Sequence, residues 1–189
     1  VTITDQKGCF KDTFVIVLEP DVLSVDTSFQ DSVSCNGLFD GTASVVASGG
    51  NGIYSYLWSD GQTTATASNL TAGTYNVTIT DQKGCFKDTS VTVLEPDALL
   101  IASMSMDSAS CNGVADGTAT ANGITGGNGI NSFSWNTTPV QTTNPATGLA
   151  AGNYTITVTD QKGCFTTRDT TVLEPDALLI ASMSMDSAS

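Results

Sequence analysis

One seven-residue sequence occurs three times in this chain of 189 residues and constrains its fold more than any other feature. Thr-Asp-Gln-Lys-Gly-Cys-Phe begins at residues 4, 80 and 159, which are 76 and 79 residues apart. Each copy lies between runs of alternating apolar and polar residues. We therefore expect a β-hairpin with its turn at Asp-Gln-Lys-Gly and the cysteine at the start of the returning strand. A hairpin repeated at this spacing predicts a tandem array of small domains.

A second repeated sequence, Val-Leu-Glu-Pro-Asp, marks the boundaries of the repeats. It begins at residues 17, 93 and 172. We expect the C-terminal hairpin of one repeat at 1–20, complete repeats at 21–96 and 97–175, and the first strand of a further repeat at 176–189. Because residues 176–189 copy 97–110 letter for letter, the chain is expected to be a segment of a longer array.

The composition favours a β protein and disfavours several kinds of partner. Nineteen acidic residues against six basic ones give a net charge of −13. Nucleic acids and acidic membrane surfaces are disfavoured, because binding to phosphate needs clustered Lys and Arg. Thr, Ser, Gly and Asn are abundant and no apolar stripe of helical period appears, which predicts an all-β fold. No apolar stretch reaches the roughly 18 residues of a membrane-spanning helix, so no membrane span is expected.

The cysteines suggest a disulfide within each repeat. Cys35 and Cys85 belong to the first complete repeat, Cys111 and Cys164 to the second, and Cys9 to the preceding hairpin. Domains of this size have small cores and often need a disulfide, so we predict the pairs Cys35–Cys85 and Cys111–Cys164. Reduced thiols are the alternative; zinc is disfavoured because the chain lacks Cys-x-x-Cys and histidine. Disulfides imply an oxidising compartment outside the cytoplasm.

Aromatic residues at equivalent positions of the two repeats predict the type of β fold. Trp58 and Trp135 lie in short alternating segments, and we expect both to anchor the cores of small sandwiches. Tyr75 and Tyr154 end the sequence Leu-x-x-Gly-x-Tyr, which is typical of a tyrosine corner. About seven short strands per repeat then predict tandem immunoglobulin-like β-sandwiches of 76–79 residues. Exposed tryptophans on a carbohydrate-binding face are the alternative.

The sequence contains few residues that could catalyse a reaction or bind a cofactor. Without histidine there is no Ser-His-Asp or Cys-His arrangement, and a catalytic site need not be copied in every repeat. We therefore predict no enzymatic activity, no catalytic residues, no metal ligands and no cofactor. Calcium is the remaining alternative, because carboxylates recur near the predicted domain ends. These carboxylates recur as equivalent pairs, which are Asp40 and Asp116, Asp81 and Asp160, Glu95 and Glu174, and Asp97 and Asp176.

The string of motifs resembles a known family. Cys-Asn-Gly, Asp-Gly-Thr-Ala, Gly-Gly-Asn-Gly, Trp, Leu-x-Ala-Gly-x-Tyr and Glu-Pro-Asp-Ala-Leu are similar to SprB-type repeats of Bacteroidetes cell-surface proteins, which include gliding-motility adhesins. The resemblance covers essentially the whole chain, although residues 129–135 lack the usual Pro-Tyr before the Trp. It implies type IX secretion, display on the cell surface and O-glycosylation at Ser32, Ser108 and Thr170.

These observations favour a structural function. We expect a non-enzymatic repeat of a long secreted adhesin or extracellular filament, acting as a semi-rigid stalk because the Leu-Glu-Pro-Asp linkers are short and restricted before proline. The expected partners are neighbouring repeats, other copies in a filament, and surface polysaccharide or other cells. A carbohydrate-binding module and a spacer attached to a secreted enzyme are the alternatives.

Overall fold

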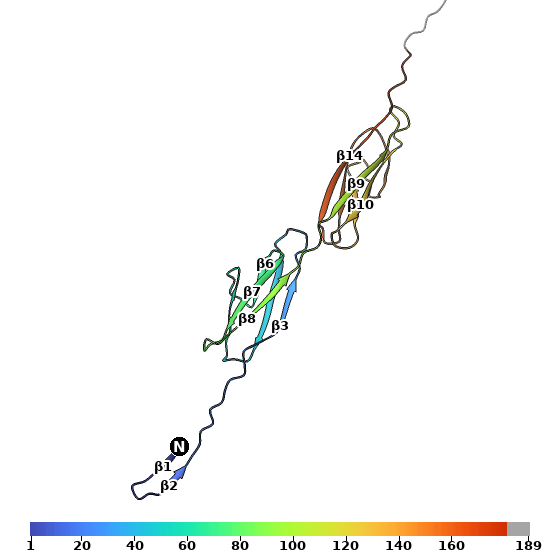
Figure 1. Ribbon diagram of the computed structural model, residues 1–189. Helices are drawn as coiled ribbons and strands as arrows, with labels where there is room; N and C mark the ends of the chain where they lie inside the picture. The colour runs from blue at the N-terminus through green and yellow to red at the C-terminus, as the bar shows by residue number, and fades with distance from the viewer. Residues whose placement is uncertain (181–189) are drawn as a thin grey trace, which may run out of the picture. The chain divides into compact units, whose positions relative to one another are not determined.

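The computed structural model describes residues 1–180, which contain strands and loops but no helix (Figure 1). Accordingly, this part of the chain has no helix that could cross a membrane. Contacts divide the chain into two compact units, which do not coincide with the sequence repeats. The first comprises Val1–Gln30, Ala43–Ala67 and Thr74–Thr92, and the second comprises Asp31–Thr42, Ser68–Gly73 and the chain from Val93 onward. The boundaries expected at residues 20/21, 96/97 and 175/176 stay a prediction.

The first complete repeat forms two three-stranded antiparallel sheets. One sheet has the order β3-β4-β6 and the other β5-β7-β8. The strands are β3 (Ser24–Asp31), β4 (Gly41–Ser48), β5 (Ser55–Trp58), β6 (Thr66–Leu70), β7 (Gly73–Thr80) and β8 (Phe86–Val93). Alternating residues of these strands are buried, as expected for sheets with one face in a core.

The second complete repeat has the same topology, with sheets β12-β10-β9 and β11-β13-β14. Its strands are β9 (Leu100–Asp107), β10 (Gly117–Thr125), β11 (Ser132–Trp135), β12 (Ala146–Leu149), β13 (Gly152–Thr159) and β14 (Phe165–Val172). Two packed sheets of this kind confirm the predicted all-β, immunoglobulin-like fold, with six strands in each sandwich rather than about seven.

The hairpins predicted from the repeated seven-residue sequence are confirmed. β13 and β14 pair from Thr159↔Phe165 onward. β1 (Thr2–Thr4) and β2 (Phe10–Asp12) pair in the same register at Thr4↔Phe10. Of the strand expected at 176–189, residues 176–180 form no strand, and the rest lies outside the described residues.

The two tryptophans lie in the sandwich cores, as predicted. Trp58 and Trp135 are each only 1% exposed. The indole N–H of Trp58 donates to the carbonyl oxygen of Thr64 at 2.8 Å, and that of Trp135 donates to Thr143 at 2.9 Å. Both rings are therefore buried with their one polar group satisfied, which is the arrangement of a core anchor.

The predicted tyrosine corner is present in the second repeat. The hydroxyl of Tyr154 donates to the carbonyl oxygen of Ala150 at 3.0 Å. Tyr154 and Tyr75 are both half-buried, so their rings line the edge of the core rather than its centre. The hydroxyl bond of Tyr154 fixes the crossover segment that leads into β13.

The Gly-Gly-Asn-Gly loop requires glycine because it lies against the backbone that leads into the first strand of the repeat. The N–H of Gly127 donates to the carbonyl oxygen of Asp97 at 2.9 Å. A Cβ on Gly126 would lie 2.0 Å from the carbonyl oxygen of Ala98, and Gly126 has a φ of +75°. No side chain fits there, so the loop sequence is explained by this close approach.

We expect Gly126→Ala to destabilise the second sandwich by about 3 kcal/mol, because it combines a backbone clash with an unfavourable φ. Gly113→Ala is the matched control: Gly113 also has a positive φ (+76°) but nothing lies within 4 Å of its added Cβ. The control is expected to cost only about 1 kcal/mol. Urea unfolding of the two variants measures the difference, and equal losses would contradict the role assigned to the close approach.

Candidate functional site at the Cys35–Cys164 disulfide

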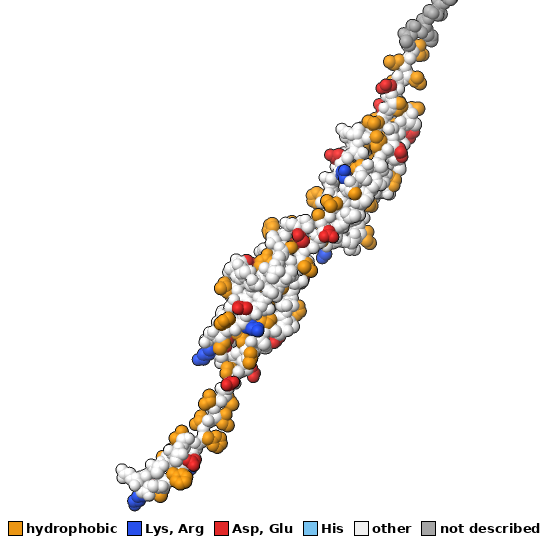
Figure 2. All heavy atoms as spheres, viewed as in Figure 1, with side chains coloured by type: hydrophobic (Ala, Val, Ile, Leu, Met, Phe, Trp, Pro, Cys, Tyr) orange, Lys and Arg blue, Asp and Glu red, His pale blue; other side chains and the backbone are white. Residues whose placement is uncertain are grey.

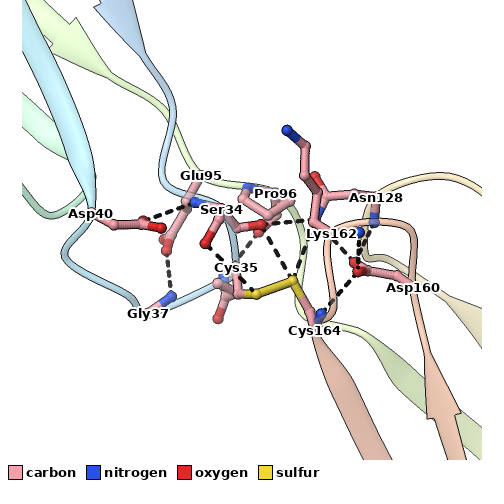
Figure 3. Close-up of a disulfide and its surroundings, with 11 residues drawn as sticks. Ser34, Cys35, Gly37, Asp40, Glu95, Pro96, Asn128, Asp160, Lys162 and Cys164 are labelled. Carbon is pink, nitrogen blue, oxygen red and sulfur yellow. Dashed lines mark hydrogen bonds between the residues drawn. A yellow bond between two sulfur atoms is a disulfide. The ribbon is translucent and has the colours of Figure 1, made fainter.

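A single disulfide is present in the described part of the chain, and it joins cysteines of successive sequence repeats (Figure 3). Cys35 lies in the loop between β3 and β4, and Cys164 lies in the hairpin between β13 and β14. Their Cα atoms are 5.6 Å apart, across a sequence separation of 129 residues. Both cysteines belong to the second compact unit.

The predicted pairs Cys35–Cys85 and Cys111–Cys164 are therefore wrong, and Cys9, Cys85 and Cys111 are exposed free thiols. The Cys35 loop is held where β8 ends, because the N–H of Val33 donates to the carbonyl oxygen of Leu94 at 3.0 Å. Cys85 precedes the first residue of β8. An eight-residue strand separates these positions by about 26 Å, whereas the Cα atoms of bridged cysteines lie within about 7 Å.

The hairpin that carries Cys164 is shaped by Asp160. One carboxylate oxygen of Asp160 accepts the N–H groups of Lys162 at 2.8 Å and Cys164 at 2.9 Å. The N–H of Gly163, whose φ is +89°, donates to the Asp160 carbonyl at 3.1 Å. The Asp-Gln-Lys-Gly turn thus presents the cysteine in a fixed position, and Asp160 is 5% exposed although it is charged.

Asn128 of the Gly-Gly-Asn-Gly loop connects this hairpin to the Cys35 loop. Its backbone N–H and side-chain amide donate to the second Asp160 oxygen at 2.7 and 3.0 Å. The same amide donates to the carbonyl oxygen of Ser34 at 2.9 Å (Figure 3). Since a disulfide sulfur has no proton, the 3.3 Å approach of Cys164 Sγ to Ser34 is a packing contact. Asn128 therefore holds both segments of the bridge.

The Cys35 loop is held by the linker that follows β8. The N–H of Gly37 donates to a carboxylate oxygen of Glu95 at 2.9 Å, and the side-chain amide of Asn36 donates to the carbonyl oxygen of Pro96 at 3.0 Å. Within the loop, the N–H of Ser34 donates to Asp40 at 2.9 Å. The recurring Asp and Glu residues are thus explained as acceptors that shape this loop.

Hydrogen bonds to these carboxylates favour their charged forms. The side-chain amide of Asn51 lowers the pKa of Asp81 from 3.8 to about 2; burial opposes the shift, and the N–H groups of Cys85, Lys83 and Asn51 add to it. Burial alone would raise the pKa of Asp160, but donors led by Asn128 outweigh it, so that the pKa is lowered. Hydrogen bonds from Ser34 likewise lower the pKa of Asp40.

Acid is expected to destabilise the first sandwich through Asp81. Because its pKa is lower in the folded protein than its ordinary 3.8, the unfolded chain takes up a proton first as the pH falls. The stabilisation is complete above about pH 5 and is lost as the pH falls from 3.8 towards 2. Unfolding midpoints across this range measure the loss. Asp81→Asn should flatten the pH dependence relative to the parent chain, and a slope equal to that of the parent would contradict this role.

The other predicted site residues are not brought together. In residues 1–180, no three carboxylate, cysteine or histidine side chains are grouped so that they could hold a metal ion. Asp116 and Glu174 repeat the roles of Asp40 and Glu95, accepting from Ser110 and Gly113 at 2.8 and 2.7 Å. The proposed glycosylation positions lie apart from one another. Ser32 and Ser108 are exposed and Thr170 is half-buried.

Two packed three-stranded sheets define the chain as an immunoglobulin-like β-sandwich protein. Residues 27–63, which contain the Cys35 loop, match the family model described as SprB repeat. This match confirms the resemblance that the motifs indicated.

No curated protein matches the chain. Among solved structures it is similar to the three N-terminal domains of the highly immunogenic outer capsid protein of bacteriophage RB49, with 20% identity and a TM-score of 0.45 over 82% of this chain. The match covers 59% of the length of that solved three-domain chain. It is also similar to a structure of Dpr11 IG1 bound to DIP-gamma, with 15% identity and a TM-score of 0.35, covering 81% of this chain and 98% of the other.

Proposed function

We propose that this chain is a load-bearing, non-enzymatic segment of a secreted cell-surface protein, in which the repeats form a semi-rigid stalk. The Cys35–Cys164 disulfide is the observation that carries this proposal. Tension applied to the two chain ends enters the bridge at Cys35 and leaves it at Cys164. The intervening residues, which span most of both sandwiches, are therefore bypassed by a covalent bond.

The linker chemistry supports a semi-rigid connection. Glu95 and Pro96 accept hydrogen bonds from the Cys35 loop, so the segment between β8 and β9 is tied to folded structure rather than free. The residue before proline is also restricted to extended backbone. A segment held in this way resists bending better than a flexible linker would.

Display outside the cell is supported by chemistry and by similarity. A disulfide persists in an oxidising compartment, and the matched SprB repeat is a cell-surface type of repeat. Export by the type IX system and a role in gliding adhesion follow from the resemblance, as do surface polysaccharide, other cells and further copies as partners. Figure 2 shows Lys and Arg side chains scattered singly on one face, which suits a solvated surface better than a nucleic-acid site.

Binding of carbohydrate on the tryptophans is not favoured as an alternative. Such binding needs an aromatic ring that can stack on the sugar, and both indoles are buried in the cores at 1% exposure.

Extension of the chain under force tests the load-bearing proposal. With the disulfide intact, pulling from both ends should leave residues 36–163 within the closed loop. Reduction should release the 129-residue separation, adding about 450 Å of contour length. A Cys35→Ser/Cys164→Ser variant should show that extra length without reductant, and a Cys85→Ser/Cys111→Ser variant should behave as the parent. Equal contour lengths before and after reduction would refute the bypass.

A further inference from the structure

Each complete repeat contains both kinds of cysteine that form the observed bridge. Cys111 follows Ser110 in a Ser-Cys-Asn-Gly loop, as Cys35 does in the first repeat. Cys85 follows the turn Asp-Gln-Lys-Gly, as Cys164 does in the second. The exposed thiols of Cys85 and Cys111 are therefore one copy of each half of the disulfide.

The Cys111 loop is already folded as the bonded Cys35 loop is. The N–H of Gly113 donates to Glu174 at 2.7 Å, and the N–H of Ser110 donates to Asp116 at 2.8 Å. The corresponding bonds around Cys35 are both 2.9 Å long. The side-chain amide of Asn112 also donates to the carbonyl oxygen of Pro175 at 3.2 Å. In the first repeat, Asn36 donates to the linker residue Pro96 in the same way. The Cys111 loop keeps its conformation without the disulfide.

The Cys85 hairpin is likewise folded as the bonded Cys164 hairpin is. Asp81 accepts the N–H groups of Lys83 and Cys85 at 2.8 and 2.9 Å, the same lengths as in the bonded hairpin. Asn51 donates its side-chain amide to Asp81 at 2.9 Å. Among residues 1–180 this amide has no second acceptor, whereas the amide of Asn128 also binds the backbone carbonyl of the opposite loop. Asn51 therefore has an amide N–H available for the backbone carbonyl of an opposite loop, which is the group that Ser34 supplies to Asn128.

Hollows of similar size lie at the bonded and the free cysteines. The hollow of about 390 Å³ at the disulfide is lined by residues of both halves, among them Asn36, Leu99 and Phe165. A hollow of about 360 Å³ at Cys85 is lined by Leu23 and Phe86, the counterparts of Leu99 and Phe165. One of about 410 Å³ at Cys111 is lined by Asn112 and the residues after Glu174. Cys85 and Cys111 therefore each sit in a hollow that holds one half of the site.

We propose that Cys85 and Cys111 are preformed half-sites of this same bridge, and that each takes the complementary cysteine of a further copy of the repeat. Cys85 accepts the cysteine of a Ser-Cys-Asn-Gly loop, and Cys111 accepts the cysteine of an Asp-Gln-Lys-Gly-Cys hairpin. Every pair of adjacent repeats is then joined by one disulfide. This inference rests on the proposed load-bearing function and extends the covalent bypass from one pair of repeats to an array.

Bond formation proceeds by thiol–disulfide exchange with a low-molecular-weight disulfide, such as oxidised glutathione. One cysteine thiolate attacks the reagent, forming a mixed disulfide and releasing one reduced thiol. The second cysteine thiolate attacks the protein sulfur of that mixed disulfide and releases the other reduced thiol. Two protein thiols are oxidised, and one reagent disulfide is reduced to two thiols.

A chain with one additional repeat tests the proposal. A second copy of residues 97–175 is inserted after residue 175, so that both junctions keep native sequence, and Thr167→Ser in the new copy marks its hairpin peptide by mass. After refolding in a glutathione redox buffer, tryptic peptides are mapped without reduction. Peptide 88–162, which contains Cys111, should be linked to the marked peptide, while peptide 12–83 stays linked to the unmarked peptide 163–168. The matched duplication of residues 21–96 tests Cys85 in the same way.

The outcomes separate this inference from the proposed function. Cys111→Ser in the extended chain should abolish only the new link and leave the marked cysteine open to alkylation. A free Cys111 beside an intact Cys35–Cys164 bond would overturn the inference alone, as would a marked cysteine bonded to any other cysteine. Loss of the Cys35–Cys164 bond in the unextended chain would instead contradict the observation behind the proposed function.

Discussion

Removal of the Cys35–Cys164 disulfide is expected to lower the free energy of unfolding by up to about 5 kcal/mol. The bond closes a loop with a sequence separation of 129 residues, and on the chain-entropy model a loop of this length constrains the unfolded chain by that amount. Small domains have little stability to spare, since native proteins are typically stable by only about 5–15 kcal/mol. We therefore expect the loss to be visible as a large fall in the unfolding midpoint.

The matched pair of double variants isolates this effect. Cys35→Ser/Cys164→Ser removes the bridge, whereas Cys85→Ser/Cys111→Ser makes the same two substitutions at exposed free thiols. Urea unfolding followed by circular dichroism should show a strong loss for the first variant and a change within about 0.5 kcal/mol for the second. Equal stabilities of the two variants would show that the bridge contributes nothing.

Trp135→Ala is expected to cost about 3–5 kcal/mol and to leave the second sandwich largely unfolded. The ring is 1% exposed and packs in a core with Leu99, Ile156 and Val158, so its removal takes a large apolar side chain out of that core. The chain has only two tryptophans, so Trp58 remains as the sole indole and reports on the first sandwich.

Circular dichroism should therefore show a loss of strand signal in Trp135→Ala while the fluorescence of Trp58 stays that of a buried indole. Ile130→Ala serves as the control, because Ile130 is 79% exposed in the loop that leads into β11. An unfolding midpoint of Trp135→Ala equal to that of the control would contradict the role of the ring as the core anchor.

The elements that the sequence predicted well are those decided by local pattern. Alternating residues around Asp-Gln-Lys-Gly specify a hairpin whatever surrounds it, and the structure pairs Thr159 with Phe165 as expected. The buried tryptophans and the Tyr154 hydroxyl bond followed from positions that both repeats share. Repetition helps because a feature present in both copies serves the common fold.

The cysteine pairing could not be obtained from local pattern, because it depends on strand direction across the whole repeat. Cys35 follows the first strand, and Cys85 precedes the last. These two strands run in the same direction in the sandwich, so the two cysteines lie at opposite ends. The predicted strand number did contain a signal. If about seven strands alternate in direction, the first and the last strand run the same way, so the end of the first strand and the start of the last strand lie at opposite ends of the sandwich.

The role of Asn128 was also missed. Gly-Gly-Asn-Gly was noted only as a motif of the family resemblance, and the bonds of Asn128 to Asp160 and Ser34 join segments that are 32 and 94 residues away in sequence. The alternation of apolar and polar residues describes only local structure, so it does not predict contacts between residues this far apart in sequence. The recurrence of Gly-Gly-Asn-Gly together with Asp-Gln-Lys-Gly-Cys in each repeat is the only sequence signal that links them.

Peptide mapping of the oxidised, unreduced chain tests the central claim most directly. Trypsin separates the four cysteines of interest, since Cys35 lies in peptide 12–83, Cys85 in 84–87, Cys111 in 88–162 and Cys164 in 163–168. The bridge between successive repeats predicts that 12–83 is linked to 163–168, with 84–87 and 88–162 carrying alkylated thiols. Links of 12–83 to 84–87 and of 88–162 to 163–168 would show that each repeat closes on itself and would contradict the account.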